Sequence, residues 1–276
     1  MPQVRVAKHS GFCYGVKRAI DMALQAAQEN GEVYSYGPLI HNPEAVSDLH
    51  SQGITVIDSL DEVSKGVVII RSHGVSPQVI QDIHDRGLTL VDATCPYVAK
   101  VQRSASQLAQ ACRTVLVVGK AVHPEVVGIC GYAGDKALVV ASASQIPEHL
   151  DGPVGVVIQT TQTKERFDAV VDELTRRGIH FEARNTVCRA TRQRQDAASE
   201  LAGTVDAMVV VGGRNSSNTT QLFNICKQHC PKAYFVETCQ ELQPQWFEDC
   251  QVIGVSAGAS TPDDQISAVV CFLESL

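Results

Sequence analysis

One pattern of hydrophobic and polar positions recurs along the chain: a short β-branched run, a loop of small and polar residues, then an amphipathic helix. The clearest example is Val67–Ile70, which leads into the loop Arg71–Val75. Ser76 and Pro77 then predict a helix start, as an N-cap residue followed by proline at the first helical position. Comparable apolar runs, each followed by a similar loop, occur at residues 115–118, 154–158, 208–211 and 252–255.

The helices between these runs have a period close to 3.6. Phe167, Val170, Val171 and Leu174 mark the inner face of one helix. The last helix is expected to bury Ile266, Val269, Val270 and Leu273, and we place Cys271 on its apolar side.

Uniformly apolar strands that alternate with helices predict an α/β fold with buried parallel sheets. Crossovers in such sheets are right-handed, and ligands bind beyond the carboxyl ends of the strands. The loops that follow the apolar runs are therefore the expected location of the functional site.

Composition and charge narrow the class of protein. The chain has 276 residues, of which 44% are hydrophobic and 19% charged, which suffices for a sizeable core and excludes a disordered chain. The net charge of -7 argues against a nucleic-acid partner, which would need clustered Lys and Arg. No apolar run reaches the ~20 residues of a membrane helix, and residues 1–10 lack a signal-peptide pattern. We therefore expect a cytoplasmic protein with no membrane partner.

Ten cysteines are many for a protein in a reducing compartment, where they act as buried apolar residues, metal ligands or reactive thiols. No Cys-x-x-Cys occurs, which excludes the spacing of zinc ribbons, thioredoxins and bacterial ferredoxins. Cys226 and Cys230 lie four residues apart on one helix face. That pair suits either a metal or simple packing, and we favour packing.

Three other cysteines share one position in the pattern. Cys13, Cys95 and Cys188 each follow an extended stretch and directly precede a predicted helix, over residues 16–28, 97–111 and 189–202. A helix N-terminus stabilises negative charge and lowers a thiol pKa. Three such thiolates are suited to bind a soft metal or an iron–sulfur cluster. Three protein ligands leave one coordination position open, which is typical of a catalytic centre.

Histidine, serine and carboxylate residues also gather in the strand-end loops. His41, His73 and His123 lie in such loops, and Glu125 follows as a candidate proton donor or as a helix-start residue. The loops Gly212–Asn218 and Ser256–Ser260 offer backbone amides and hydroxyls for phosphate oxygens, but neither has a Walker A or dinucleotide spacing. These groups indicate a small diphosphate or carboxylate in a closed pocket.

The motifs occur together in one order along almost the whole chain. They are Gly11-Phe12-Cys13-x-Gly15-Val16, His41-Asn42-Pro43, Ser72-His73-Gly74-Val75, Asp92-Ala93-Thr94-Cys95-Pro96, His123-Pro124-Glu125-Val126, Gln159-Thr160-Thr161, Thr186-Val187-Cys188, Asn215-Ser216-Ser217-Asn218 and Ala257-Gly258-Ala259-Ser260. In this set the chain resembles the 4-hydroxy-3-methylbut-2-enyl diphosphate reductase family.

The resemblance implies the last step of the non-mevalonate isoprenoid pathway: reduction of 4-hydroxy-3-methylbut-2-enyl diphosphate to isopentenyl and dimethylallyl diphosphates. It implies three small parallel-sheet α/β domains in a pseudo-threefold cloverleaf around an oxygen-sensitive 4Fe–4S cluster. We place these domains at residues 1–95, 96–187 and 188–276, and allow for the N-terminal strand pairing with the third domain. A monomer or a homodimer is expected.

The resemblance also implies residue roles, carried over motif by motif. Cys13, Cys95 and Cys188 would each bind one iron, and the fourth iron would be open to the substrate hydroxyl. Glu125 would deliver a proton, with Thr160 near the departing oxygen. The diphosphate would be bound by His41, His73, His123, Ser216, Ser217, Asn218 and Ser260.

The implied electron donor is a ferredoxin or a flavodoxin. Two residues depart from the family pattern: Arg189 directly follows the third cysteine, and Arg192 stands where we associate the family with Gln. With Arg184 and Arg194 they predict a basic group. It is interpreted either as a solvated helix face or as a docking patch for an acidic donor.

Other functions stay open at this point. A non-redox hydro-lyase or synthase, similar to quinolinate synthase in its three-domain, three-cysteine plan, would use the cluster only as a Lewis acid and consume no electrons. An anion-binding protein with incidental cysteines would be colourless. Zinc in the three-cysteine site would also give a colourless protein, with stoichiometric metal.

Overall fold

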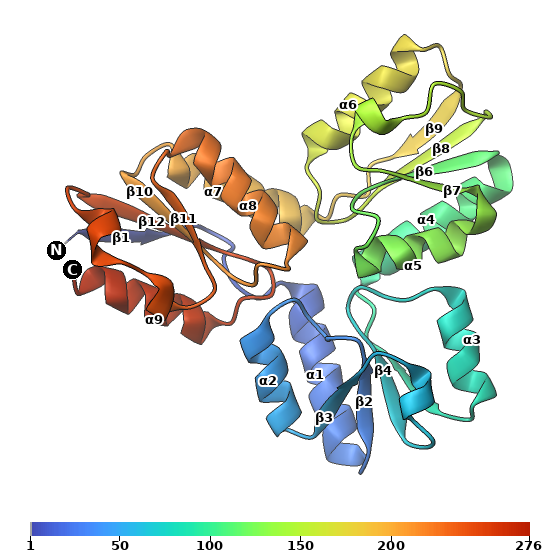
Figure 1. Cartoon of the computed structure of the whole chain (residues 1–276), viewed down its shortest axis with the longest axis horizontal. Coiled ribbons are helices and arrows are strands. Elements are labelled where there is room, and N and C mark those ends of the chain that lie inside the picture. Colours follow the sequence, from blue (N-terminus) through green and yellow to red (C-terminus); the bar gives the residue numbers. More distant parts are fainter. Residues whose placement is uncertain (1) are drawn as a thin grey trace. The chain divides into compact units, whose positions relative to one another are not determined.

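The computed structural model describes residues 2–276 and contains three four-stranded, entirely parallel sheets (Figure 1). Contacts divide the chain into two compact units. The first unit comprises the N-terminal segment through Val16, His41–Ser47 and Arg189–Leu276, and the second comprises Lys17–Ile40 and Asp48–Cys188. The first unit holds one sheet, and the second unit holds two.

The sheet of the first unit has the strand order β1-β12-β10-β11. Its strands are β1 (Gln3–Val6), β12 (Val252–Ala257), β10 (Ala207–Val211) and β11 (Ala233–Val236). Helix α9 (Asp263–Glu274) packs on one face, and α7 (Arg189–Ala202) and α8 (Ser217–His229) pack on the other (Figure 1). Burial of both faces explains why β10 is apolar at every position.

The first sheet of the second unit has the order β3-β2-β4-β5. Its strands are β3 (Ile54–Ile57), β2 (Val33–Tyr36), β4 (Val67–Ile70) and β5 (Thr89–Asp92). The helices in this part of the chain are α1 (Tyr14–Glu29), α2 (Pro43–Ser51) and α3 (Pro77–Asp85). Ile83 of α3 is fully buried against Val68 and Ile70 of β4, so the predicted stripe of this helix forms part of the core.

The second sheet of this unit has the order β7-β6-β8-β9. Its strands are β7 (Ala137–Val140), β6 (Thr114–Val118), β8 (Val154–Ile158) and β9 (Phe181–Arg184). Helices α4 (Pro96–Ala111) and α5 (Pro124–Ala133) cover one face, and α6 (Lys164–Arg176) covers the other. Phe167, Val170 and Leu174 of α6 are buried, as their spacing predicts.

The three sheets repeat one plan, with an outer strand (β1, β5 or β9) beside β12, β4 or β8, and then β10, β2 or β6. Each outer strand is followed by one of the cysteines at the helix starts, Cys13, Cys95 or Cys188. The expectation of three parallel α/β sheets is confirmed. The limits predicted for the three domains stay a prediction. Strand β1 pairs in parallel with β12, so the N-terminal strand belongs to the sheet of the C-terminal segment.

The sequence also predicts the surroundings of three cysteines outside the site, and the structure tests these predictions. Cys226 and Cys230 are buried in the core beneath α8, which confirms packing for this pair. Burial raises the pKa of the Cys226 thiol to about 12, so it stays protonated. Cys271 is exposed, and its placement on the apolar side of α9 was wrong. The buried stripe of this helix follows Ile266, Val269 and Leu273, and Cys271 lies off that stripe.

Candidate active site

Two groups of site residues can be described, one in each unit, and in both the residues lie at the carboxyl ends of the strands. In the second unit His73 follows β4, His123 follows β6 and Thr160 follows β8. In the first unit Ser216–Asn218 follow β10 and Ser260 follows β12. The strand ends therefore carry the chemistry, as the α/β pattern predicts.

Glu125 is the most perturbed carboxyl of the site. It lies in the first turn of α5, is 1% exposed, and accepts two hydrogen bonds from Thr160. The Thr160 amide donates to Oε1 at 2.6 Å, and the Thr160 hydroxyl donates to Oε2 at 2.8 Å. Burial raises the pKa of Glu125 to about 7, although both Thr160 bonds favour the charged form. A carboxyl with this pKa is suited to give up a proton at neutral pH.

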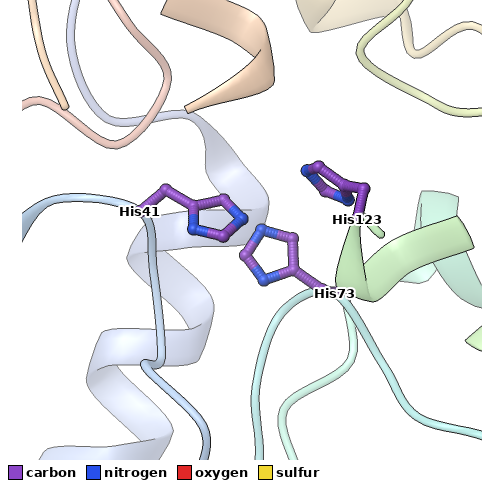
Figure 2. Close-up of side chains that lie close together, drawn as sticks. All are labelled: His41, His73 and His123. Carbon is purple, nitrogen blue, oxygen red and sulfur yellow. The ribbon is translucent and has the colours of Figure 1, made fainter. Parts of the chain in front are cut away.

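His123 is oriented by the start of the same helix. It is the N-cap of α5, and its Nδ1 accepts a hydrogen bond from the Glu125 amide at 3.1 Å. Since Nδ1 accepts, the proton of a neutral ring lies on Nε2. The His73 ring lies edge-on to His123, with centroids 5.5 Å apart (Figure 2). The loops after β4 and β6 thus bring two imidazoles to one place.

Backbone hydrogen bonds connect this group to two of the cysteines. The Cys95 amide donates to the Ser72 carbonyl at 3.0 Å, which joins the Cys95 loop to the His73 loop. The Cys188 amide donates to the Thr160 carbonyl at 3.0 Å. Thr160 therefore positions both the buried acid and a thiol-bearing segment, and a continuous series of contacts runs from Cys95 to Cys188.

The first unit brings Cys13 and His41 beside loops of its own sheet. The Cys13 amide donates to the Ala259 carbonyl at 3.1 Å. The Ser260 hydroxyl donates to the backbone carbonyl of His41 at 3.1 Å. His41, also drawn in Figure 2, comes from the loop between β2 and α2. Gly213 lies so close to this loop that a Cβ there would meet the His41 carbonyl oxygen at 2.6 Å.

The start of α8 has the properties of an anion site. Ser216 is the N-cap, and its hydroxyl accepts a hydrogen bond from the Thr219 amide at 3.3 Å. Ser217 and Asn218 are buried in the first turn. Both polar atoms of the Asn218 amide and the Thr219 hydroxyl are buried and have no hydrogen-bond partner among residues 2–276. Since buried donors are costly unless satisfied, the Asn218 Nδ2 and Thr219 hydroxyl donors fit an anion such as a phosphate group.

The three thiols at the helix starts differ from the buried cysteines in a way that fits a soft metal group. Cys13, Cys95 and Cys188 are partly exposed and stand directly before α1, α4 and α7. Cys112, Cys226 and Cys230 are buried, and burial raises their pKa. Accessible thiols at helix starts are suited to metal binding, whereas the buried thiols are not.

Comparison with known proteins decides the family. A family model described as "LytB protein" matches residues 4–274 of the chain. The chain belongs to the LytB protein family. The family identification made from the motifs is therefore confirmed.

Among the LytB relatives, a protein from Geobacter metallireducens is 44% identical over 271 residues, covering 97% of this chain and 95% of the relative. A protein from Trichlorobacter lovleyi is 45% identical over 275 residues, covering 99% and 98%. Both are named 4-hydroxy-3-methylbut-2-enyl diphosphate reductase.

Solved structures of the same kind are also similar. A structure of (E)-4-hydroxy-3-methyl-but-2-enyl diphosphate reductase, described as the terminal enzyme of the non-mevalonate pathway, is 41% identical over 100% of both chains, with a TM-score of 0.73. The reductase from Plasmodium falciparum is 26% identical, with a TM-score of 0.93 over 99% of this chain and 88% of that one.

One predicted feature was wrong. Arg194 does not lie on a solvated helix face with Arg184, Arg189 and Arg192. It is 4% exposed, and its guanidinium donates to the Gly11 carbonyl at 2.6 Å. Arg189 and Arg192 are exposed. Arg194 faces inward because it lies on the buried side of α7, with Thr191 and Ala198.

Two further residues position the site, and the sequence motifs do not mark either of them in this role. Arg194 is one, because it binds the loop that carries Cys13. Gln265 of α9 is the other, because its buried side-chain oxygen accepts from the Asn42 amide at 2.9 Å and its amide donates to Glu44. Both act through contacts between distant parts of the chain, and no local motif marks such contacts.

Proposed function

We propose that the chain is a 4-hydroxy-3-methylbut-2-enyl diphosphate reductase. Its overall reaction consumes two electrons and two protons: the allylic C–O bond breaks, the hydroxyl leaves as water, and a proton is added at carbon to give isopentenyl or dimethylallyl diphosphate. The observation that carries the proposal is the buried Glu125–Thr160 pair, connected through the Thr160 carbonyl to Cys188.

The proposed cofactor is one 4Fe–4S cluster bound by Cys13, Cys95 and Cys188. When bound, such a cluster would supply electrons one at a time and Lewis acidity toward a hydroxyl oxygen. Each of the three thiols lies beyond the carboxyl end of an outer strand, β1, β5 or β9. Their partial exposure and their place at helix starts support this assignment.

Binding of the diphosphate is assigned to Ser216, Ser217, Asn218 and Ser260 together with His41, His73 and His123. The unsatisfied Asn218 amide and the start of α8 support a phosphate group there. The neutral His123 ring presents an Nε2–H donor, which suits a phosphate oxygen. A site of fixed donors of this kind binds the anion with little reorganisation.

Proton delivery is assigned to Glu125. Its pKa of about 7 keeps a large protonated fraction at neutral pH, and the Thr160 hydroxyl fixes the carboxyl. Thr160 is assigned to hydrogen-bond the departing oxygen through the same hydroxyl. General acid catalysis by a group with this pKa lowers the barrier for loss of hydroxide as water.

No helix among residues 2–276 combines the length and apolarity that a membrane span requires. The proposed location is the cytoplasm, where thiols stay reduced.

Turnover of 4-hydroxy-3-methylbut-2-enyl diphosphate by the anaerobically reconstituted protein tests this function. With dithionite-reduced methyl viologen, we expect consumption of two electrons per product and formation of both isopentenyl and dimethylallyl diphosphate, identified by NMR. Conversion without electron consumption would favour the hydro-lyase alternative, and a colourless, zinc-containing protein would contradict the cluster.

A further inference from the structure

Helix α4 has an exposed face of unusual charge. The helix begins at the residue after Cys95, and its sequence contains no Asp or Glu. Tyr97, Lys100 and Arg103 are exposed and spaced by three residues, so their side chains follow one side of the helix. Tyr97 is 43% exposed although it is aromatic. This face is therefore basic and carries an apolar ring two residues from a proposed cluster ligand.

The positive charge of this face is largely uncompensated. Neither Lys100 nor Arg103 takes part in an ion pair within residues 2–276. Arg18 adds a third cation beside the Cys95 loop, because its guanidinium donates to the Thr94 carbonyl at 3.2 Å. The acidic group in this loop is Asp92, whose carboxylate accepts from the Thr94 amide at 2.9 Å. A basic surface thus stands out on a chain with a net charge of -7.

The reaction explains why such a surface is useful. A reductase that takes up single electrons needs a carrier to approach its cofactor, and opposite charge steers that encounter. Exposed aromatic residues and Arg are enriched at protein interfaces. The exposed face of α4 offers an aromatic residue, Tyr97, and an arginine, Arg103.

We propose that the face formed by Tyr97, Lys100 and Arg103 docks a small acidic one-electron carrier protein. This inference rests on the proposed function. Two successive encounters supply the two electrons consumed per product, and each encounter leaves one carrier molecule oxidised by one electron. The carrier contacts the helix that begins directly after Cys95, so the electron enters on the Cys95 side of the site.

The test uses the charge-reversal double variant Lys100→Glu/Arg103→Glu in the reconstituted holoprotein. The matched control is Lys65→Glu/Arg113→Glu, which changes the net charge by the same amount. Lys65 and Arg113 are exposed and precede β4 and β6, so they lie at the amino ends of the strands, away from the site residues. The probe is a reduced acidic flavodoxin, and its binding is also measured directly by titration calorimetry.

For Lys100→Glu/Arg103→Glu, we expect the KM for flavodoxin and the dissociation constant to rise about 10-fold or more at low ionic strength. The difference from wild type should shrink as salt is added, because added ions screen exposed charges. The control variant should stay within about twofold of wild type, and turnover driven by dithionite should be unchanged in both variants. Equal effects in the test and control variants, or unchanged flavodoxin binding, would overturn the docking proposal.

Failure of the docking proposal can be separated from failure of the proposed function. If the wild-type holoprotein does not reduce the diphosphate with dithionite, the proposed function fails, and the binding titration still decides whether the carrier uses this face. If dithionite turnover is normal and carrier binding ignores the α4 charges, the function stands and the docking surface is wrong.

Discussion

Replacing Glu125 with Gln changes the chemistry of the site while preserving its packing. The Gln side-chain amide has the same shape as the carboxyl. Its oxygen can still accept the hydrogen bond from the Thr160 backbone amide, which in the wild type lies 2.6 Å from Oε1. The Thr160 hydroxyl, which donates to Oε2 at 2.8 Å, can rotate and accept from the new amide. No cavity forms, and both contacts with Thr160 can be kept. The variant therefore isolates the loss of the titratable proton.

The expected loss of turnover follows from the role of a general acid, which contributes about 10²–10⁴-fold. The pKa of Glu125 is about 7, so the protonated fraction of the wild-type acid falls as pH rises through 7. Wild-type kcat should fall above that pH. Glu125→Gln should show a kcat lower by about 10²–10⁴-fold and no such decline with pH.

The same pKa has a consequence for stability. Burial raises the pKa of Glu125 from 4.5 to about 7, so the folded protein holds this proton more tightly than the unfolded chain does. The contribution to stability is complete below pH 4.5 and is lost as pH rises to 7, by about 3 kcal/mol. Glu125→Gln lacks this titration, so it should gain stability relative to wild type between those pH values.

Urea unfolding of wild type and Glu125→Gln at pH 5 and pH 8, together with anaerobic turnover over the same range, measures both effects. Substrate binding and iron content should be preserved in the variant. If the free energies of unfolding of the two proteins changed with pH in the same way, the raised pKa of the buried Glu125 carboxyl would be refuted. Full turnover by the variant would remove Glu125 from proton delivery.

Two positioning residues give further predictions. Gln265→Leu leaves the buried Asn42 amide unsatisfied. It should cost about 1–3 kcal/mol in urea unfolding and raise the KM for the diphosphate, because Asn42 follows a proposed substrate ligand. Arg194→Met removes the bond to the Gly11 carbonyl. It should shorten the lifetime of the bound cluster in air, followed by absorbance, because the loop carrying Cys13 loosens; an unchanged lifetime would show that Arg194 does not position this loop.

The fold was predictable where the hydrophobic pattern is strong. The central strands at 67–70 and 154–158 occur within the bounds read from the sequence, and the helix predicted at 97–111 begins one residue earlier. These segments are uniformly apolar or have a clear 3.6 period, so local sequence and tertiary burial agree. Cys271 was misplaced because its neighbours Val270 and Phe272 are also apolar, which predicts a broad buried face for the last helix. In the structure the buried apolar stripe of this helix is narrow and leaves Cys271 exposed.

The site residues were predictable where they lie at strand ends. They were less predictable where their hydrogen-bond partner is distant in the sequence. Glu125 allowed two interpretations, as a helix-start residue and as an acid. The structure shows that it lies in the first turn of α5 and is buried against Thr160, 35 residues away. The sequence indicated a surface charge at Arg194 because the partner of this side chain, the Gly11 carbonyl, lies 183 residues away. Such long-range pairs leave no periodic signal in the sequence.

The proposed function depends on one inorganic centre bound by the three thiols at the helix starts. Its most direct test is the iron and acid-labile sulfide content of anaerobically reconstituted protein, compared with Cys13→Ser, Cys95→Ser, Cys188→Ser and the control Cys239→Ser. We predict about four iron and four sulfide per chain in wild type and in the control, and a large loss in each of the other three. Wild-type cluster content in any one of those three variants would contradict the account.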